Sequence, residues 1–195
     1  AITSSGDHVI VPNPSYPIHP YGFIIAGATV QSIDSKPDQL FVKNLYNILS
    51  LHNNKAKVLV LNYPNNPSTE IASLDFYKEV VGICTKFGVY ILSDIAYAEI
   101  YFDGFIPPSI LEIPKAKNIA VEFSSLSKTY SMPGWRVGFA VGNKKLIEAL
   151  TKIKSYLDYG AFTPVQVAAI AALNGSQDCV EDIRSIYLKR RNILV

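Results

Sequence analysis

Residues 121–139 have the sequence VEFSSLSKTYSMPGWRVGF, and the interpretation of the whole chain starts from this stretch. The run 119–123 is mainly apolar, β-branched and aromatic, so it predicts a buried strand. A hydroxyl-rich turn with one lysine, Lys128, follows the strand, and a second apolar run covers 137–141. The sequence therefore predicts two strands joined by a loop that presents a lysine.

Lys128 has two interpretations. It could be an ordinary surface lysine, because most lysines are solvated. The flanking side chains favour a second interpretation, because the hydroxyls of Ser125 and Ser127 and the guanidinium of Arg136 could together hold a phosphate. An amine presented into a pocket can attack a carbonyl. Pyridoxal phosphate combines a carbonyl with an anionic group, so these residues predict a site for that cofactor.

The segment 125–139 resembles the cofactor-lysine segment of class I/II aminotransferases of fold type I. The likeness rests on the spacing from the lysine to the arginine and on the Gly-x-Arg-x-Gly context around Arg136. The resemblance implies that Lys128 forms the internal aldimine with pyridoxal phosphate and that Arg136 binds the cofactor phosphate, beside Ser125 and Ser127.

Two proline-rich loops carry further parts of the resemblance. Tyr16 lies in a Pro-x-aromatic-Pro segment like the one that stacks an aromatic ring on the cofactor in this family; alternatively, it only packs its loop. Asn66 matches the donor to the cofactor's phenolic oxygen, although asparagines are also ordinary turn formers. Ser68 and Thr69 stand where the family commonly has Thr-Gly, which leaves the conformation of this turn open.

Asp94 and Tyr97 follow the apolar run 89–92. A carboxylate at the end of a buried strand needs a cationic or hydrogen-bonding partner, and a protonated pyridine nitrogen is one. The resemblance to the family's Ser-Asp-x-x-Tyr segment implies that Asp94 binds the ring nitrogen and Tyr97 the phenolic oxygen. The alternative for Asp94 is a helix N-cap.

Apolar runs alternate with amphipathic segments along the chain. Strands are expected at 8–11, 28–33, 58–61, 89–92, 119–123 and 137–141, and helices at 18–26, 37–50, 74–87, 144–156, 164–173 and 180–194. This alternation predicts an α/β fold in which helices cover both faces of a mostly parallel sheet, giving three layers, with the site at the carboxyl edge of the strands.

Composition excludes several classes of function. A formal net charge of +2, without a basic block, gives no support for nucleic-acid binding. No apolar run approaches about 20 residues, so no membrane span is expected. Cys84 and Cys179 lack metal-ligand spacing, and we expect buried thiols in a reducing, cytoplasmic environment rather than a disulfide framework. No metal site is predicted.

Both ends of the 195-residue chain predict a piece of a longer protein, because Ala1 is no initiator methionine and the last residues continue a helical pattern. The resemblance implies that residues 1–195 are part of the large, cofactor-binding domain. A phosphate-binding glycine loop would precede Ala1, and a small domain with a carboxylate-binding arginine would follow Val195. The chain alone is therefore expected to hold cofactor weakly and to have no substantial transaminase activity.

The resemblance implies transamination between an amino acid and a 2-oxo acid by a homodimeric protein. The alanine aminotransferase branch is the best match, with diaminopimelate and aspartate aminotransferases close to it. A pyridoxal-phosphate lyase or decarboxylase would need the same cofactor-holding residues, so it stays an alternative. A second alternative is the aminotransferase-like effector domain of a transcriptional regulator. A plain nucleotide-binding domain is disfavoured, because no Gly-x-Gly-x-x-Gly turn follows a strand.

Overall fold

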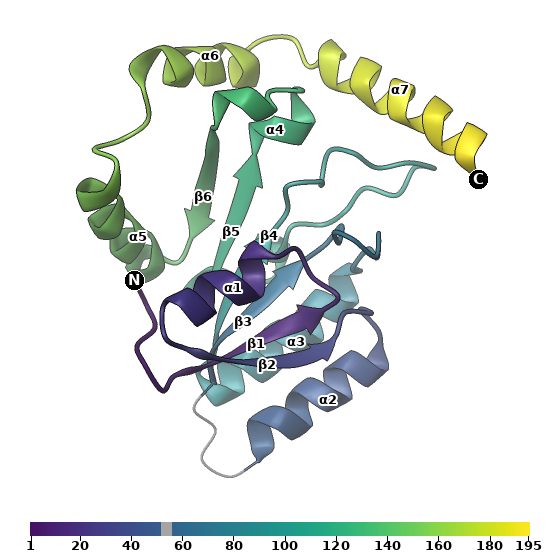
Figure 1. Cartoon of the computed structure of the whole chain (residues 1–195). Coiled ribbons are helices and arrows are strands. Elements are labelled where there is room, and N and C mark those ends of the chain that lie inside the picture. Colours follow the sequence, from purple (N-terminus) through teal and green to yellow (C-terminus); the bar gives the residue numbers. More distant parts are fainter. Residues whose placement is uncertain (52–55) are drawn as a thin grey trace.

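The computed structural model describes residues 1–51 and 56–195. Its centre is a six-stranded sheet with the strand order β2-β1-β3-β4-β5-β6 (Figure 1). Neighbouring strands from β2 to β5 are parallel, and β6 is antiparallel to β5. The strands are β1 (His8–Asn13), β2 (Thr29–Asp34), β3 (Ala56–Asn62), β4 (Tyr90–Asp94), β5 (Ala120–Ser125) and β6 (Gly138–Gly142).

Helices cover both faces of this sheet, which confirms the predicted fold class. In Figure 1, α1 crosses the front of the sheet, α3 lies behind it, and α5 and α6 stand beyond β6. The helices are α1 (Ile18–Ile25), α2 (Gln39–Ser50), α3 (Leu74–Phe87), α4 (Leu126–Thr129), α5 (Lys144–Leu157), α6 (Thr163–Asn174) and α7 (Asp178–Leu194). Among these, α4 was not predicted.

Successive residues of the central strands pack against opposite layers, as the two-residue period of a strand requires. One buried cluster includes Ile10, Leu59 and Ile91 and packs with side chains of α2 and α3. The other includes Val9 and Val58 and packs with Phe23 of α1. Burial of each such side chain contributes about 1.5–3 kcal/mol, so both faces of the sheet stabilise the fold.

Local sequence signals fix where helices begin and end. The Ser73 hydroxyl accepts a hydrogen bond from the Phe76 amide at 3.1 Å and caps α3. Gly88 ends the same helix in the left-handed conformation, with φ of 68°. Both residues directly flank the helix that the sequence predicts at 74–87. Asp38 caps α2 by accepting from the amides of Leu40 and Phe41.

The cysteines correct one expectation. Both thiols are free, and Cys84 is buried as predicted, but Cys179 is exposed. Cys179 lies in the first turn of α7, an amphipathic helix whose outer side faces solvent. In the described part of the chain, no helix combines the length and the apolar character that crossing a bilayer would require.

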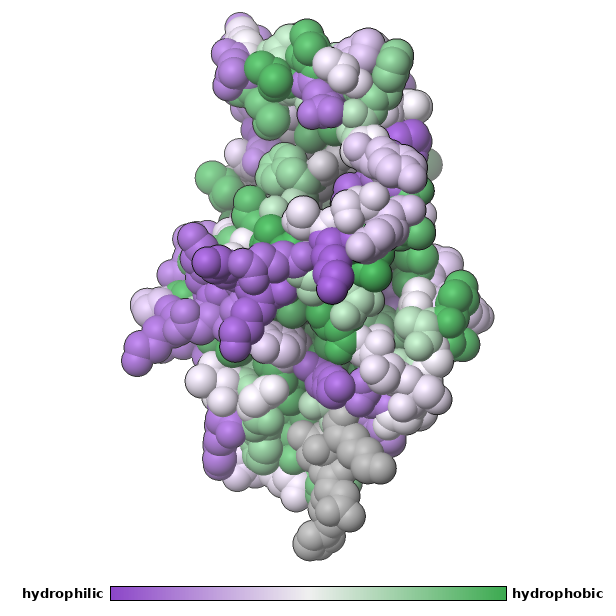
Figure 2. Space-filling model, turned by 90° about the vertical axis from the view of Figure 1, so that its left-hand side faces the viewer, coloured by the Kyte–Doolittle hydropathy of each residue, from purple (hydrophilic) through white to green (hydrophobic). Residues whose placement is uncertain are grey.

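The side of the molecule that carries α5 and α6 exposes apolar side chains. Figure 2 views this side, and hydrophobic residues reach the surface at its upper end, where α6 lies in Figure 1. Leu157 ends α5, and Tyr159 and Phe162 lie in the segment that joins the two helices; all three are largely exposed. Large exposed apolar patches are typical of interaction surfaces.

Candidate active site

The carboxyl edge of the sheet carries a cavity of about 350 Å³. Tyr16 follows β1, Asn66 follows β3, Asp94 ends β4 and Ser125 ends β5, so adjacent strands deliver side chains to one place. The eight residues singled out in the sequence all line this cavity: Tyr16, Asn66, Asp94, Tyr97, Ser125, Ser127, Lys128 and Arg136. In open α/β sheets, ligands bind at this edge, where the strand order reverses; here it reverses beside β1.

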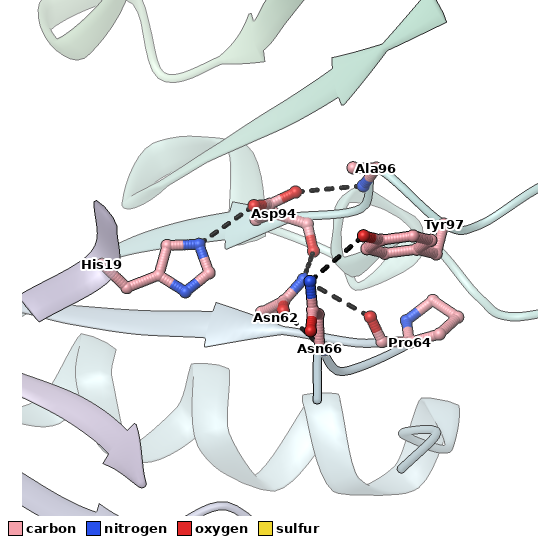
Figure 3. Close-up of polar contacts among 7 residues, drawn as sticks. All are labelled: His19, Asn62, Pro64, Asn66, Asp94, Ala96 and Tyr97. Atoms are coloured by element: carbon pink, nitrogen blue, oxygen red, sulfur yellow. Dashed lines mark hydrogen bonds and ion pairs between the residues drawn. The ribbon is translucent and has the colours of Figure 1, made fainter. Parts of the chain in front are cut away.

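Asp94 is held by a histidine that the sequence analysis did not single out. His19 on α1 lies with Nε2 2.9 Å from Asp94 Oδ2, and the Ala96 amide donates to Oδ1 at 3.0 Å (Figure 3). His19 is only 8% exposed, and its Nδ1 has no hydrogen-bond partner in the described structure. The contact to Ala96 closes a turn, and no helix directly follows Asp94, so the alternative role as a helix N-cap is not what the structure shows. Asp94 thus has a fixed orientation while it lines the cavity.

Tyr16 and His19 belong to the same turn at the start of α1. The His19 amide donates to the Tyr16 carbonyl at 3.0 Å, and the two rings meet edge to face with centroids 6.0 Å apart. Tyr16 is 47% exposed and lines the cavity, so a planar ring could lie against it.

Asn62 ties the ends of two strands to the loop that carries Asn66. Its amide donates to the Asp94 carbonyl at 3.0 Å, and its Oδ1 accepts from the Asn66 amide at 3.1 Å. Asn66 Nδ2 in turn donates to the Tyr97 hydroxyl at 3.2 Å, as Figure 3 shows. Because Asn62 is almost fully buried, the wall formed by Asn66 and Tyr97 is anchored to the sheet.

Lys128 lies in the single turn of α4 and not in an irregular loop. The Ser125 hydroxyl accepts from the Ser127 amide at 3.2 Å and caps this turn. Lys128 Nζ lies 5.6 Å from the centroid of the Tyr97 ring. Within residues 1–51 and 56–195, no carboxylate pairs with it and no hydrogen bond reaches it. The amine is therefore available to a ligand in the cavity.

Arg136 lines the cavity two residues before Gly138, where β6 leaves no room for a side chain against β5. A Cβ on Gly138 would lie 2.5 Å from the Ser124 carbonyl oxygen, so only glycine fits there. Arg136 adopts φ of 51°, and its Nη1 donates to the Pro133 carbonyl at 2.9 Å. In the part of the chain that the structure describes, the other guanidinium donors have no partner and could bind an anion.

The loop between Asn66 and α3 resolves the question that its sequence left open. Thr69 has φ of 64°, in the left-handed region that glycine adopts without strain. The position where glycine is common in the resembling family therefore needs glycine-like geometry. The chain meets that need with a β-branched residue, at a cost in strain.

Comparison with known proteins places the chain in a family. The model of the family "Aminotransferase class I and II" matches residues 1–195, so the chain belongs to this family. The chain is 54% identical over its whole length to the putative aminotransferase AatC of Rhizobium meliloti (strain 1021), of which it covers 48%. It is 49% identical to the glutamate-pyruvate aminotransferase AlaC of Escherichia coli (strain K12), again over its whole length, and covers 47% of it.

Other relatives have different substrates in their names. The LL-diaminopimelate aminotransferase of Natranaerobius thermophilus is 45% identical over the whole chain, which covers 50% of it. Among solved structures, an aspartate aminotransferase double mutant of Thermus thermophilus matches with a TM-score of 0.89 at 27% identity, over 99% of this chain and 50% of that one. The fold is that of fold type I aminotransferases. The chain spans about half the length of the curated relatives it matches.

The cofactor of this family is pyridoxal phosphate, and the cavity has the chemistry to hold it. Among the described residues, the Lys128 amine and the remaining Arg136 guanidinium donors have no hydrogen-bonding partner, so they could meet an aldehyde and a phosphate. The oriented Asp94 carboxylate could face a ring nitrogen. Asn66 and Tyr97 could face a phenolic oxygen. The cavity volume also lies in the range of small-molecule sites.

Proposed function

We propose that residues 1–195 form the greater part of the large domain of an aminotransferase and that their cavity holds pyridoxal phosphate. One observation carries the proposal: the Lys128 amine and the Arg136 guanidinium, from the segment 125–139, line one cavity together with the oriented Asp94 carboxylate at the end of β4. Each residue alone has an ordinary structural explanation. A purely structural role for each residue would not require all of them to meet at the carboxyl edge of the sheet, where ligands bind in such folds.

The proposed roles are those that the family resemblance implies, and the contacts of each side chain support them. Arg136, Ser125 and Ser127 bind the phosphate, and Tyr16 stacks against the ring. Asp94 keeps a proton on the ring nitrogen, because a carboxylate fixed by His19 and the Ala96 amide stabilises a cation beside it. Tyr97, with its hydroxyl hydrogen-bonded to Asn66, binds the phenolic oxygen.

When bound, pyridoxal phosphate supplies an aldehyde and a protonated ring that takes up the electron pair left as the substrate α-proton departs. Lys128 Nζ would hold the cofactor by its aldehyde, and a substrate amine would take the place of Nζ there. The freed Lys128 amine removes the α-proton as a general base and later delivers a proton as a general acid. The Tyr97 ring, with its centroid 5.6 Å from Nζ, limits the positions open to this amine in the cavity.

We propose the alanine/glutamate substrate type. Support comes from AlaC, whose name gives glutamate and pyruvate as substrates, and from its 49% identity to the chain. The LL-diaminopimelate enzymes, at 45% identity, make that amino acid the competing substrate. The small molecules involved are thus an amino acid and a 2-oxo acid, exchanged in two half-reactions.

Product analysis with the full-length protein tests this function. We expect L-alanine with 2-oxoglutarate to yield pyruvate and glutamate in equal amounts, faster than LL-diaminopimelate donates its amino group. Release of ammonia or carbon dioxide, without a new amino acid, would instead identify a lyase or a decarboxylase. The Lys128→Ala variant is the control, since it removes the reacting amine.

We further propose that the full-length protein is a cytoplasmic homodimer. The exposed apolar side chains between α5 and α6 support a subunit interface, because such surfaces are usually covered. The two free thiols are compatible with a reducing compartment. Sedimentation of the full-length protein, with Phe162→Ser as the variant, tests the interface. A monomeric wild-type protein at micromolar concentration would contradict it.

A further inference from the structure

Two arginines on one face of α7 hold the segment that follows Tyr97. Arg184 and Arg191 are seven residues apart, which is about two helical turns. Arg184 Nε donates to the Glu99 carbonyl oxygen at 3.1 Å, and its Nη2 lies 3.4 Å from the Glu99 carboxylate. Arg191 binds both carboxylate oxygens of Asp103, with Nη2 3.0 Å from Oδ1. Both ends of the segment 99–103 are therefore attached to α7.

The same two guanidinium groups also contact the aromatic residues inside this segment. The Arg184 guanidinium carbon lies 3.8 Å from the centroid of the Tyr101 ring, and that of Arg191 lies 5.0 Å from the Phe102 ring. The Arg184 side chain is only 16% exposed. A lone surface ion pair contributes little, but a partly buried guanidinium that combines a ring contact with a backbone hydrogen bond does more.

The pKa of Asp103 reflects its contact with Arg191. The hydrogen bond from Arg191 lowers the pKa of the Asp103 carboxyl below its ordinary value. The carboxylate therefore stays charged throughout the neutral range, and its pair with Arg191 persists there.

Backbone hydrogen bonds between residues close in sequence connect the segment 99–103 to the cavity. The Ile100 amide donates to the Tyr97 carbonyl at 2.9 Å, and the Ala98 amide donates to the Ile95 carbonyl at 2.9 Å. Two consecutive turns thus lead from Asp94 at the end of β4 to Ile100. Tyr97, which contacts Asn66 and Lys128 inside the cavity, lies within these turns. A displacement of the segment 99–103 would move Tyr97.

We propose that Arg184 and Arg191 are positioning residues that fix Tyr97 in the cavity by attaching the segment 99–103 to α7. This inference rests on the proposed function for the part that concerns the cofactor. Neither arginine lines the cavity that contains Lys128. The position of α7 nevertheless determines how the Tyr97 side chain meets a ligand in that cavity.

The test uses the full-length protein with the double variant Arg184→Met/Arg191→Met, which keeps unbranched side chains but removes both guanidinium groups. The matched control is Arg190→Met, because Arg190 is on the same helix, is exposed, and makes no described contact with the segment 99–103. The first measurement is amide hydrogen exchange in the cofactor-free protein. We expect the Ala98 and Ile100 amides to exchange about tenfold faster in the double variant, and no change in the control.

The second measurement is the pH midpoint of the visible absorption of added pyridoxal phosphate, compared with that of Tyr97→Phe. The double variant is expected to shift the midpoint in the same direction as Tyr97→Phe, and to add no further shift in the Tyr97→Phe background. Full additivity of the two shifts, or unchanged exchange at Ala98 and Ile100, would overturn the proposal. If the wild-type protein binds no cofactor, the proposed function fails, and the exchange measurement still decides whether α7 holds the segment.

Discussion

Next to Arg136, the backbones of β5 and β6 approach each other closely at Gly138. Replacing Gly138 tests this close approach. An alanine Cβ there would lie 2.5 Å from the Ser124 carbonyl oxygen. Close C···O contacts between strands are about 3.3 Å, so the two backbones would have to separate by about 0.8 Å. Gly134, two residues before Arg136, is the matched control, because a Cβ there meets nothing within 4 Å.

The separation would weaken the pairing of Ser125 with Gly138 and the hydrogen bond from the Leu126 amide to the Val137 carbonyl, now 3.2 Å. Each backbone hydrogen bond contributes about 1 kcal/mol net, and overpacking costs about 1–3 kcal/mol. We therefore expect Gly138→Ala to lower the free energy of unfolding by about 2–4 kcal/mol. Arg136 would move relative to Ser125, and displacements approaching 1 Å cost up to about a hundredfold in function.

Urea unfolding of the full-length variants measures the first effect, and pyridoxal phosphate titration measures the second. Gly134→Ala is expected to retain wild-type stability within about 0.5 kcal/mol. Equal stability of Gly138→Ala and Gly134→Ala would refute the close approach of β5 and β6 beside Arg136.

Three further predictions concern single side chains. His19→Ala should weaken cofactor binding about ten- to hundredfold, because Asp94 loses its partner at 2.9 Å and a charge-assisted hydrogen bond contributes about 1.5–3 kcal/mol. Titration with pyridoxal phosphate measures this affinity, and an unchanged affinity would contradict the prediction. Thr69→Gly should raise the free energy of unfolding by about 1 kcal/mol, because it relieves a φ of 64°; a loss of stability on urea unfolding would show that the turn is unstrained. Burial raises the pKa of the Glu122 carboxyl above 4.5, so its stabilising contribution is present below the unfolded pKa and is lost as the pH rises through the folded pKa. Glu122→Gln should therefore gain stability relative to wild type with rising pH, and a difference that does not vary with pH would disprove this.

Much of the fold could be predicted because its signals are local. The wholly apolar run inside β3 indicates a strand buried on both faces, and Ser73 and Gly88 mark the ends of α3 by their capping chemistry. The helix α4 could not be predicted in the same way. Its four residues are too few to display a helical period, and its cap, Ser125, also fits a turn.

The candidate site was predictable where a residue stands in a distinctive local motif, as Lys128 and Asp94 do. His19 was missed because its partner is 75 residues away in the sequence, and no local pattern encodes that contact. A signal was nevertheless present, since His19 is the one residue of α1 whose side chain can carry a positive charge, and most of its neighbours there are apolar. The contacts of Arg184 and Arg191 could not be predicted for the same reason, because their partners lie 85 and 88 residues away in the sequence.

The most direct test of the whole account is where pyridoxal phosphate becomes attached to the protein. The full-length protein is incubated with the cofactor, reduced with borohydride and mapped by mass spectrometry, with Lys128→Ala and the exposed-lysine variant Lys144→Ala beside it. We predict a single modified peptide that carries the cofactor on Lys128, retained in Lys144→Ala and lost in Lys128→Ala. Attachment at a different lysine, or equal attachment in Lys128→Ala, would contradict the assignment of this cavity as the active site.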